Sequence, residues 1–296
     1  MDKTLMLIVN PAAGRGAYKT GFADAMHALS AAGYRVDLYF TAGRGDATAF
    51  AREHAANYDA LACVGGDGTL SEVLSGLIGL DDPPPLGYFP MGTANDVATT
   101  LGLPKNNILE AVRRMTAGTP HPYDVGAFGE RDHFAYIAAF GAFTEVSYAT
   151  PQDQKNLLGH LAYVLQGMAA LPSIESVHTR VEYDGGVYEG DLVYGSMSNS
   201  TSVAGIVRFP EQMVSLSDGY SELVLVKNPT ALEDLADLAG SVLTQRFDSD
   251  SLIVLHTKKA RFRFDHPVAW TRDGESGGEH QDITLGNLHA PVKLIF

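Results

Sequence analysis

Residues 60–77 read ALACVGGDGTLSEVLSGL, a short apolar run, a glycine-rich loop and then a second apolar pattern. The run at 60–64 predicts a buried strand, and apolar residues spaced i, i+3, i+4, i+7 after the loop predict a helix packed on a sheet. Glycine amides after a strand can approach a phosphate group closely, because no Cβ stands in the way. Asp67 nevertheless places a carboxylate in the middle of this loop. A divalent cation between the carboxylate and the phosphates would remove the repulsion between them.

Strand and helix patterns alternate on both sides of this stretch. Such an order predicts a mostly parallel sheet covered by helices on both faces. The expected α/β domain covers residues 1–120. Its strands are predicted at 4–10, 34–40 and 60–64, an extended segment at 83–92, and helices at 18–32, 46–57, 93–101 and 106–116, besides the helix after the glycine loop.

The character of the chain changes near residue 120. The segment Gly118-Thr119-Pro120-His121-Pro122 contains a glycine and two prolines, and runs rich in β-branched and aromatic residues follow it. These runs predict a second domain over residues 121–296, built on an antiparallel sheet or sandwich with two helices. Its strands are predicted at 134–140, 177–185, 191–199, 221–227, 251–257 and 260–265, and its helices at 155–171 and 230–245.

Composition limits the classes of protein that the chain can belong to. Its 296 residues are 45% hydrophobic and carry a formal net charge of -14. This composition supports a sizeable core, while the negative charge disfavours nucleic acid and anionic membranes unless basic residues cluster locally. Cys63 is the single cysteine, so no disulfide can form within the chain. The N-terminal residues lack signal-peptide features and no long apolar run predicts a membrane-spanning helix, so a cytoplasmic protein is expected.

Four short motifs carry residues suited to binding phosphates or a metal ion. Besides the glycine loop at 65–69, they are NPAAGRG at 10–16, MGTAND at 91–96 and DGE at 273–275. Each motif has a structural alternative when it stands alone: a strand-to-helix turn, a helix N-cap or a polar hairpin turn. Their occurrence together, in this order, is specific.

The four motifs resemble those of the diacylglycerol kinase catalytic family, soluble bacterial lipid kinases grouped with sphingosine and ceramide kinases. The resemblance covers essentially the whole chain and implies an N-terminal phosphofructokinase-like domain that binds ATP. A C-terminal antiparallel β-sandwich would form the other wall of a cleft, and in some members the end of the chain packs back on the first domain. The implied nucleotide-binding residues are Asn10, Gly14, Arg15, Thr41, Gly65, Gly66, Asp67, Gly68, Thr69, Glu72 and Thr93.

The same resemblance implies that the γ-phosphoryl group of ATP is transferred to a lipid hydroxyl. Glu275 is the implied general base, and Asp273 would orient it or help to hold the metal. Asp67 would hold Mg²⁺ against the phosphates, directly or through water. A magnesium ion is also implied at the turn SLSDGY, where oxygen ligands suit this ion. The implied ligands in this turn are Ser215, Asp218 and Tyr220.

The expected lipid is diacylglycerol, which would give phosphatidic acid. Residue types leave other acceptors open: monoacylglycerol, phosphatidylglycerol, sphingoid lipids, undecaprenol and, for a kinase of the same superfamily, NAD. A non-catalytic nucleotide or lipid sensor on this scaffold is an alternative from a different class of protein. The expected partners are ATP and a membrane lipid reached from the surface, with no nucleic acid, and the sequence leaves a homodimer open.

One local feature offers an acidic protein a route to a membrane. In KKARFRF, residues 258–264, alternation along a strand predicts a basic face formed by Lys259, Arg261 and Arg263. Such a face could attract anionic lipid and support transient peripheral association. The structural alternative is a solvated face or an edge strand protected by charge.

Overall fold

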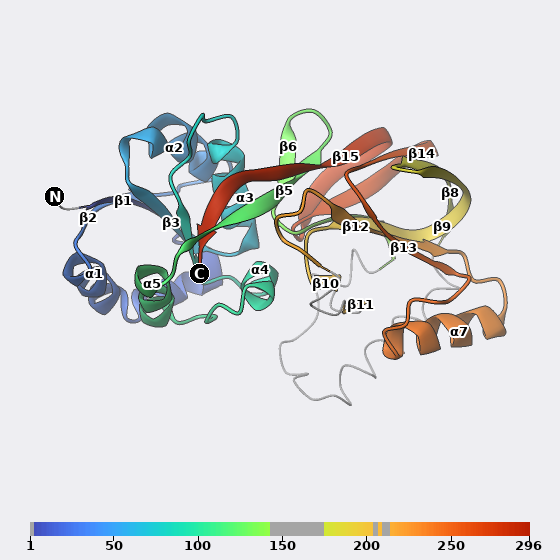
Figure 1. Ribbon diagram of the computed structural model, residues 1–296, viewed down its shortest axis with the longest axis horizontal. Helices are drawn as coiled ribbons and strands as arrows, with labels where there is room; N and C mark the ends of the chain where they lie inside the picture. The colour runs from blue at the N-terminus through green and yellow to red at the C-terminus, as the bar shows by residue number, and fades with distance from the viewer. Residues whose placement is uncertain (1–2, 143–174, 204–206, 209–213) are drawn as a thin grey trace. The chain divides into compact units, whose positions relative to one another are not determined.

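The computed structural model describes residues 3–142, 175–203, 207–208 and 214–296. The helix predicted at 155–171 lies outside these ranges. The chain divides into two compact units (Figure 1), and two strands, β5 (Pro120–Phe128) and β15 (Glu275–Ile295), contribute residues to both. The first unit comprises Met1–Val125, Leu216–Asp218 and Leu288–Phe296, and the second comprises Gly126–Ser215 and Gly219–Asn287.

The first unit is built on a parallel sheet. β1 (Lys3–Val9) lies between β2 (Tyr34–Phe40) and β3 (Ala60–Gly65), β4 (Leu86–Pro90) pairs with β3, and the end of β15 pairs with β4. All of these pairs are parallel. Every residue of β3 and β4 is buried, which explains their continuous apolar sequences.

Helices cover both faces of this sheet (Figure 1). On one face, α1 (Phe22–Ala31) and α5 (Ile108–Ala117) share a core with apolar side chains of β1 and β3. On the other, α2 (Asp46–His54) packs tightly against α3 (Asp67–Leu77). The short helices η1 (Ala13–Lys19), η2 (Ala55–Asn57) and α4 (Asp96–Thr100) complete the unit. No helix in the described part of the chain is long and apolar enough to span a membrane.

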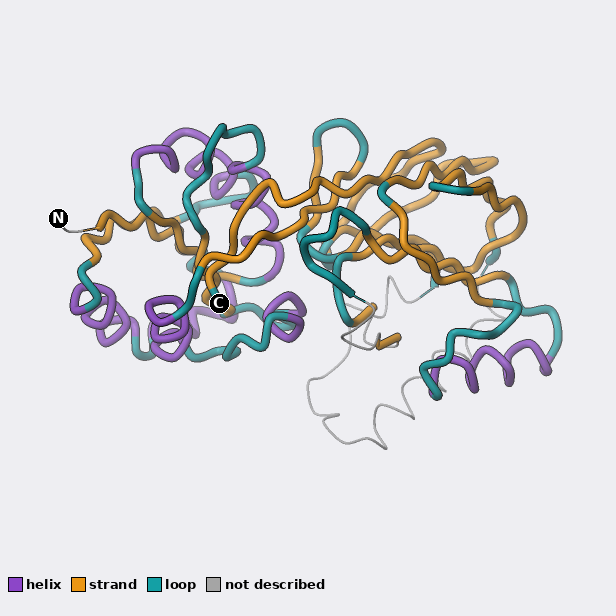
Figure 2. The backbone as a smooth tube through the Cα atoms, viewed as in Figure 1, coloured by secondary structure: helices purple, strands orange, loops and turns teal. Residues whose placement is uncertain are grey.

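The second unit consists mainly of strands (Figure 2), and the strand pairs within it are antiparallel. Two long strands, β9 (Gly186–Ser198) and β14 (Lys259–Arg272), each pair with β8 (Val177–Tyr183) along one half and with β7 (Ile137–Gly141) along the other. β7 and β8 therefore occupy one position of the sheet, end to end. Beyond β9 the sheet continues with β12 (Ser221–Lys227) and β13 (Leu252–Thr257), and beyond β14 with β15, β5 and β6 (Asp132–Phe134).

An aromatic-rich core lies against these strands. Trp270 packs against Phe140 and Phe262 with ring centroids 5.0 and 5.1 Å apart. Inward side chains from most of the strands join the same cluster. Except for β10 (Ser202–Val203) and β11 (Val207–Arg208), which pair only with each other, the described strands of this unit belong to one hydrogen-bonded sheet. The unit also contains the helix α7 (Leu232–Leu243).

Two long strands, β5 and β15, were not predicted from the sequence, and neither were the short strands β6, β10 and β11. β5 begins with the prolines that suggested a break, and β15 contains consecutive glycines and a proline. Neither has the regular apolar alternation of an isolated strand signal, and both are held by pairing with neighbouring strands.

Candidate functional site

Three loops meet at the carboxyl ends of β1, β3 and β4 in the first unit. The Asn10 side chain donates a hydrogen bond from Nδ2 to the Thr69 hydroxyl at 2.9 Å. The Met91 amide donates to the Gly65 carbonyl oxygen at 2.7 Å. The motifs NPAAGRG, GGDGT and MGTAND therefore assemble at one edge of the sheet, the edge at which open α/β folds bind ligands.

Glycine is required where these loops touch. A Cβ on Gly14 would lie 2.2 Å from the Met91 carbonyl oxygen, and a Cβ on Gly92 would lie 2.5 Å from the Cα of Gly66. These glycines thus allow close packing of the loops as well as any approach to phosphate. Arg15, next to Gly14, has a φ of 55°, a left-handed conformation that is strained for a residue with a side chain.

Asp67 is the first residue of α3, and its carboxylate is directed at the beginning of α4. Oδ2 accepts a hydrogen bond from the Asp96 amide at 2.9 Å, and Oδ1 accepts one from the Val97 amide at 3.2 Å. These are the first two amides of α4 and lie at the positive end of its dipole. The carboxylate in the glycine loop is therefore stabilised by backbone N–H groups of the neighbouring loop.

Two residues that the sequence did not single out complete this arrangement. Asn95 is fully buried, accepts a hydrogen bond from the Gly92 amide at 2.9 Å and donates one to the Gly92 carbonyl oxygen at 2.9 Å. The buried Tyr88 hydroxyl lies 3.3 Å from Asp67 Oδ1 and 3.4 Å from Asn95 Oδ1. Asn95 lies inside a quoted motif, whereas Tyr88 lies in a strand and carried no signal of function.

Removal of this hydroxyl is expected to weaken nucleotide binding. The change Tyr88→Phe removes a hydroxyl that lies between Asp67 Oδ1 and Asn95 Oδ1, each of which keeps a backbone amide donor. A lost hydrogen bond costs roughly 1 kcal/mol, so the Kd for ATP should rise about fivefold. Calorimetric titration measures this. In the matched control Tyr58→Phe, the lost hydroxyl donates to Asp37 at 2.9 Å in the same unit, away from the loops, and the Kd should not change. Equal values of Kd for both variants and the wild type would contradict the role of Tyr88.

The other predicted nucleotide residues of the first unit have local structural roles. Glu72 caps α2, because its carboxylate accepts hydrogen bonds from the amides of Gly45 at 2.9 Å and Ala47 at 3.3 Å. The Thr41 amide donates to the Val9 carbonyl oxygen and so holds the end of β2 beside β1. Gly68 lies in the first turn of α3, and the exposed Thr93 lies in the bend before α4. Their contacts with a nucleotide stay predictions.

In the second unit, the motif DGE forms a tight hairpin between β14 and β15. Asp273 and Gly274 are its two turn residues, both with positive φ (48° and 79°), and Arg272 pairs with Glu275 on either side. The Glu275 side chain is exposed. The Asp273 carboxylate is buried and accepts hydrogen bonds from the amides of Ala135, Tyr136 and Ile137. The two acidic residues of the motif therefore have different surroundings. The Glu275 side chain is open to solvent, and the Asp273 carboxylate is enclosed by backbone amides.

The predicted metal-binding segment SLSDGY forms a turn with Gly219 at a φ of 80°. The carbonyl oxygen of Tyr220 already accepts a hydrogen bond from Asn287 Nδ2 at 2.8 Å. The Leu216 carbonyl oxygen accepts one from the amide of Asp124, a fully buried residue whose carboxylate is bonded to the Ala290 amide. Among the described residues, no group of three or more His, Cys, Asp or Glu side chains is arranged to hold a metal ion.

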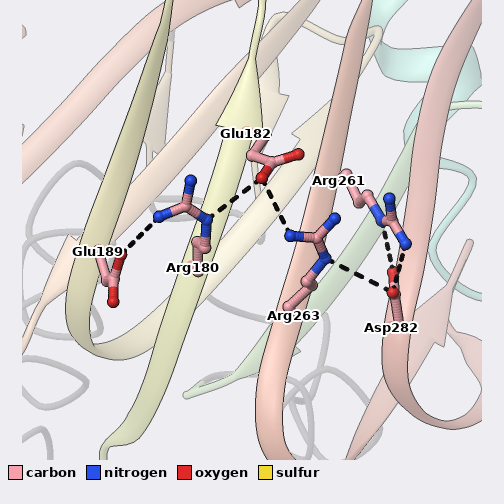
Figure 3. A network of polar contacts seen from close by, with 6 residues as sticks. All are labelled: Arg180, Glu182, Glu189, Arg261, Arg263 and Asp282. Carbon is pink, nitrogen blue, oxygen red and sulfur yellow. Dashed lines mark hydrogen bonds and ion pairs between the residues drawn. The ribbon is translucent and has the colours of Figure 1, made fainter.

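Of the three residues in the predicted basic strand face, Arg261 and Arg263 are neutralised by carboxylates, and Lys259 is exposed. The strands β9, β8, β14 and β15 are neighbours in the sheet, and Figure 3 shows arginines and carboxylates alternating across them. Arg261 is bonded bidentately to Asp282 at 2.6 and 2.8 Å. Arg263 lies between Glu182 at 3.0 Å and Asp282 at 3.6 Å. The charged residues of this network are Glu189, Arg180, Glu182, Arg263, Asp282 and Arg261. With three cations and three anions, the network has no excess positive charge to attract an anionic membrane.

Acidification is expected to remove the stabilisation that this network contributes. The hydrogen bond from Arg180 lowers the pKa of Glu182 below its ordinary 4.5, so the unfolded chain binds the additional proton between the two values. The contribution is complete above the ordinary pKa and is lost as the pH falls through the lowered, folded-state pKa. At pH 7, Glu182→Gln should lower the melting temperature by about 2 °C, because exposed ion pairs contribute little.

Melting curves of Glu182→Gln and the wild type between pH 7 and pH 3 measure this difference, which should disappear at the acid end. Glu130→Gln, at an exposed position in the turn between β5 and β6, is the control and should melt like the wild type throughout. A difference for Glu182→Gln that does not vary with pH would contradict the expectation.

Solved structures define the class of fold. A diacylglycerol kinase from Bacillus anthracis str. Sterne has a TM-score of 0.76 and 26% sequence identity, covering 99% of this chain and 97% of that one. An NAD kinase from Archaeoglobus fulgidus in complex with ATP has a TM-score of 0.54 and 13% identity, covering 99% and 93%, and so shares the fold alone. The fold is the one that diacylglycerol kinases and NAD kinases have in common.

Sequence relatives assign the family. Residues 4–128 match the family model of the diacylglycerol kinase catalytic domain. The diacylglycerol kinase of Bacillus subtilis (strain 168) is 33% identical over 277 residues, 93% of this chain and 91% of that protein. The diacylglycerol kinase of Staphylococcus aureus (strain JH9) is 37% identical over 290 residues, 94% of this chain and 88% of that protein. The chain belongs to the diacylglycerol kinase family and is a lipid kinase.

Proposed function

We propose that this lipid kinase transfers the γ-phosphoryl group of ATP to a hydroxyl group of diacylglycerol and so produces phosphatidic acid. The observation that carries the proposal is the meeting of three glycine-bearing loops at the carboxyl edge of a parallel sheet, in a relative of diacylglycerol kinases. Backbone amides and hydroxyls there can hold a triphosphate without a Walker lysine. The proposed nucleotide-binding residues are Asn10, Gly14, Arg15, Thr41, Gly65, Gly66, Asp67, Gly68, Thr69, Glu72 and Thr93.

In this proposal, one domain binds the nucleotide and the other binds the lipid. Residues 1–120 would bind the nucleotide on the parallel sheet, and residues 121–296 would bind the lipid on the antiparallel strands of a sandwich. The close packing of the loops supports the first assignment, because a rigid array of amides can bind an anion without prior rearrangement.

Magnesium is the proposed metal, and the chemistry of the available donors fits it. Asp67 Oδ2 accepts a hydrogen bond from the Asp96 amide, and a carboxylate oxygen can accept a further partner. Magnesium commonly takes one or two carboxylates together with phosphate oxygens and water. Asp67 would hold the ion directly or through water, and Ser215, Asp218 and Tyr220 would offer oxygens at the turn. When bound, the ion would neutralise charge on the phosphates.

Glu275 is the proposed general base. The lipid hydroxyl oxygen would attack the γ-phosphorus while the bond from that phosphorus to the β–γ bridging oxygen breaks and ADP leaves. The hydroxyl proton would pass to the Glu275 carboxylate late in the reaction, as the new O–P bond forms. The exposure of this side chain at the start of β15 supports the role, because the base has to reach a substrate from outside the core.

The lipid would be reached by transient association with the membrane surface. The neutral network around Arg261 and Arg263 makes that face a poor docking site. Charge reversal at Lys259, Arg261 and Arg263 should therefore leave sedimentation with anionic vesicles unchanged. The other proposed partner is ATP. A second copy of the chain, in a homodimer, is also part of the proposal.

A panel of acceptors with radiolabelled ATP, separated by thin-layer chromatography, tests the function. The panel contains diacylglycerol, monoacylglycerol, phosphatidylglycerol, sphingosine, undecaprenol and NAD. We expect label in phosphatidic acid. If only another product carried label, its acceptor would be the substrate in place of diacylglycerol. ATP binding without any transfer would indicate a nucleotide sensor.

A further inference from the structure

Asp273 has an unusual set of contacts for a residue in an exposed hairpin. Its carboxylate accepts three consecutive backbone amides: Oδ2 from Ala135 at 2.5 Å, and Oδ1 from Tyr136 at 3.0 Å and from Ile137 at 3.1 Å. Its own amide donates to the Ile137 carbonyl oxygen at 2.9 Å. Four hydrogen bonds thus join the apex of the β14–β15 hairpin to the bend that precedes β7.

From these contacts we infer that Asp273 is a positioning residue, which holds Glu275 in place by fastening the hairpin to this bend. The inference rests on the proposed function, in which Glu275 is the base. It assigns Asp273 no contact with substrate or metal.

Backbone amides account for the buried charge of this carboxylate. Three N–H dipoles present their positive ends to its two oxygens, and such a concave set of amides favours an anion. The inference therefore requires no metal ion at Asp273.

The geometry of the hairpin transmits the anchor to Glu275. Asp273 and Gly274 form a two-residue turn with positive φ at both positions, so Glu275 is the first strand residue after the anchor. On the other side, β14 pairs with β7 through Arg272 and Ala138, directly after the bend. A shift of the hairpin relative to the bend would therefore displace the Glu275 backbone.

Asparagine is the most informative replacement at this position. It has nearly the same size and tolerates the left-handed turn, but its amide NH₂ would face an N–H donor where a carboxylate oxygen now accepts. Misplacement of a catalytic group by about 1 Å can cost on the order of a hundredfold in rate. We expect Asp273→Asn to lower kcat by about 10- to 100-fold, while the KM for ATP changes by less than about twofold.

Asp234→Asn is the matched control. The Asp234 carboxylate, in the same unit, accepts hydrogen bonds from the amides of Thr230 and Ala231, both at 2.9 Å, and caps α7. Both variants remove a carboxylate that holds backbone amides, so both should lower the melting temperature. Only Asp273→Asn should lower kcat. An equal loss of kcat in both variants would overturn the inference.

The double variant Asp273→Asn with Glu275→Gln tests whether Asp273 acts through Glu275. If it does, the first change lowers kcat strongly in the wild type but hardly at all once Glu275 is already glutamine. If Asp273 instead contributes independently, for example through a metal, the two losses multiply. Full multiplication would overturn the inference.

Hydrogen exchange provides a readout that does not depend on activity. In Asp273→Asn the amides of Ala135, Tyr136 and Ile137 should exchange faster than in the wild type, because one of the two acceptor oxygens becomes an NH₂ donor and the bend is held less firmly. Unchanged exchange would show that the carboxylate does not hold the bend and would overturn the inference. A wild-type protein that labels no lipid would instead refute the proposed function, so the two failures are distinguishable.

Discussion

Glu275→Gln is expected to lower kcat for phosphoryl transfer to lipid by at least about a hundredfold, because general base catalysis contributes roughly 10²- to 10⁴-fold. Glutamine keeps the size of the side chain but cannot accept the hydroxyl proton. The position is exposed, so the melting temperature should stay within about 1 °C of the wild type. Transfer of label from ATP to diacylglycerol in detergent micelles, at saturating substrates, measures the rate.

The control for this variant is Glu279→Gln, an exposed glutamate on the same strand. It makes the same chemical change four residues away and should leave kcat as it is. ATP affinity should be the same in both variants, because neither belongs to the nucleotide-binding loops. A rate for Glu275→Gln within threefold of the wild type would remove Glu275 from the proposed mechanism.

Asp67→Ala should have the second large effect, a loss of at least about a hundredfold in transfer together with a loss of stability. The carboxylate caps the first amides of α4 and lies against the Tyr88 hydroxyl. Removal of a helix cap costs about 1–2 kcal/mol. The loop that follows β4 would lose its side-chain attachment to the glycine loop and keep the bond from the Met91 amide to the Gly65 carbonyl oxygen, so the array proposed to hold the phosphates would be less well fixed. Urea unfolding and the same transfer assay measure the two effects.

Asp59→Ala separates loss of stability from loss of function. The Asp59 carboxylate accepts hydrogen bonds from the Thr4 amide at 2.7 Å and from the Thr4 hydroxyl at 2.9 Å. Thr4 is near the amino end of β1, far along the strand from the loops. The variant should lose stability and keep its rate. If Asp67→Ala kept its rate as well, the carboxylate would be a structural cap only.

Much of the first unit could be predicted because its signals are local. The buried run at β3, the amphipathic spacing of α3 and the turn residues between them all lie within a few residues of one another. β15 shows the opposite case. Its glycines and proline argue against a strand, yet pairing with β14 along one part and with β4 near its end makes it one. Such pairing depends on segments that are distant in sequence, so no local pattern reports it.

The sequence by itself determined the alternation of strands and helices in the first unit and the presence of four motifs rich in glycine and acidic residues. It also determined which side chains could bind phosphate or a metal, because that depends on residue type. Only the tertiary structure decided what the carboxylates contact. The Asp67 carboxylate accepts hydrogen bonds from amides of α4, which begins 29 residues later in the chain. The Asp273 carboxylate accepts one from the Ala135 amide, 138 residues earlier, and Arg261 donates to Asp282 on the neighbouring strand. A carboxylate binds whichever donors packing brings within about 3 Å, and those donors come from other elements of the fold.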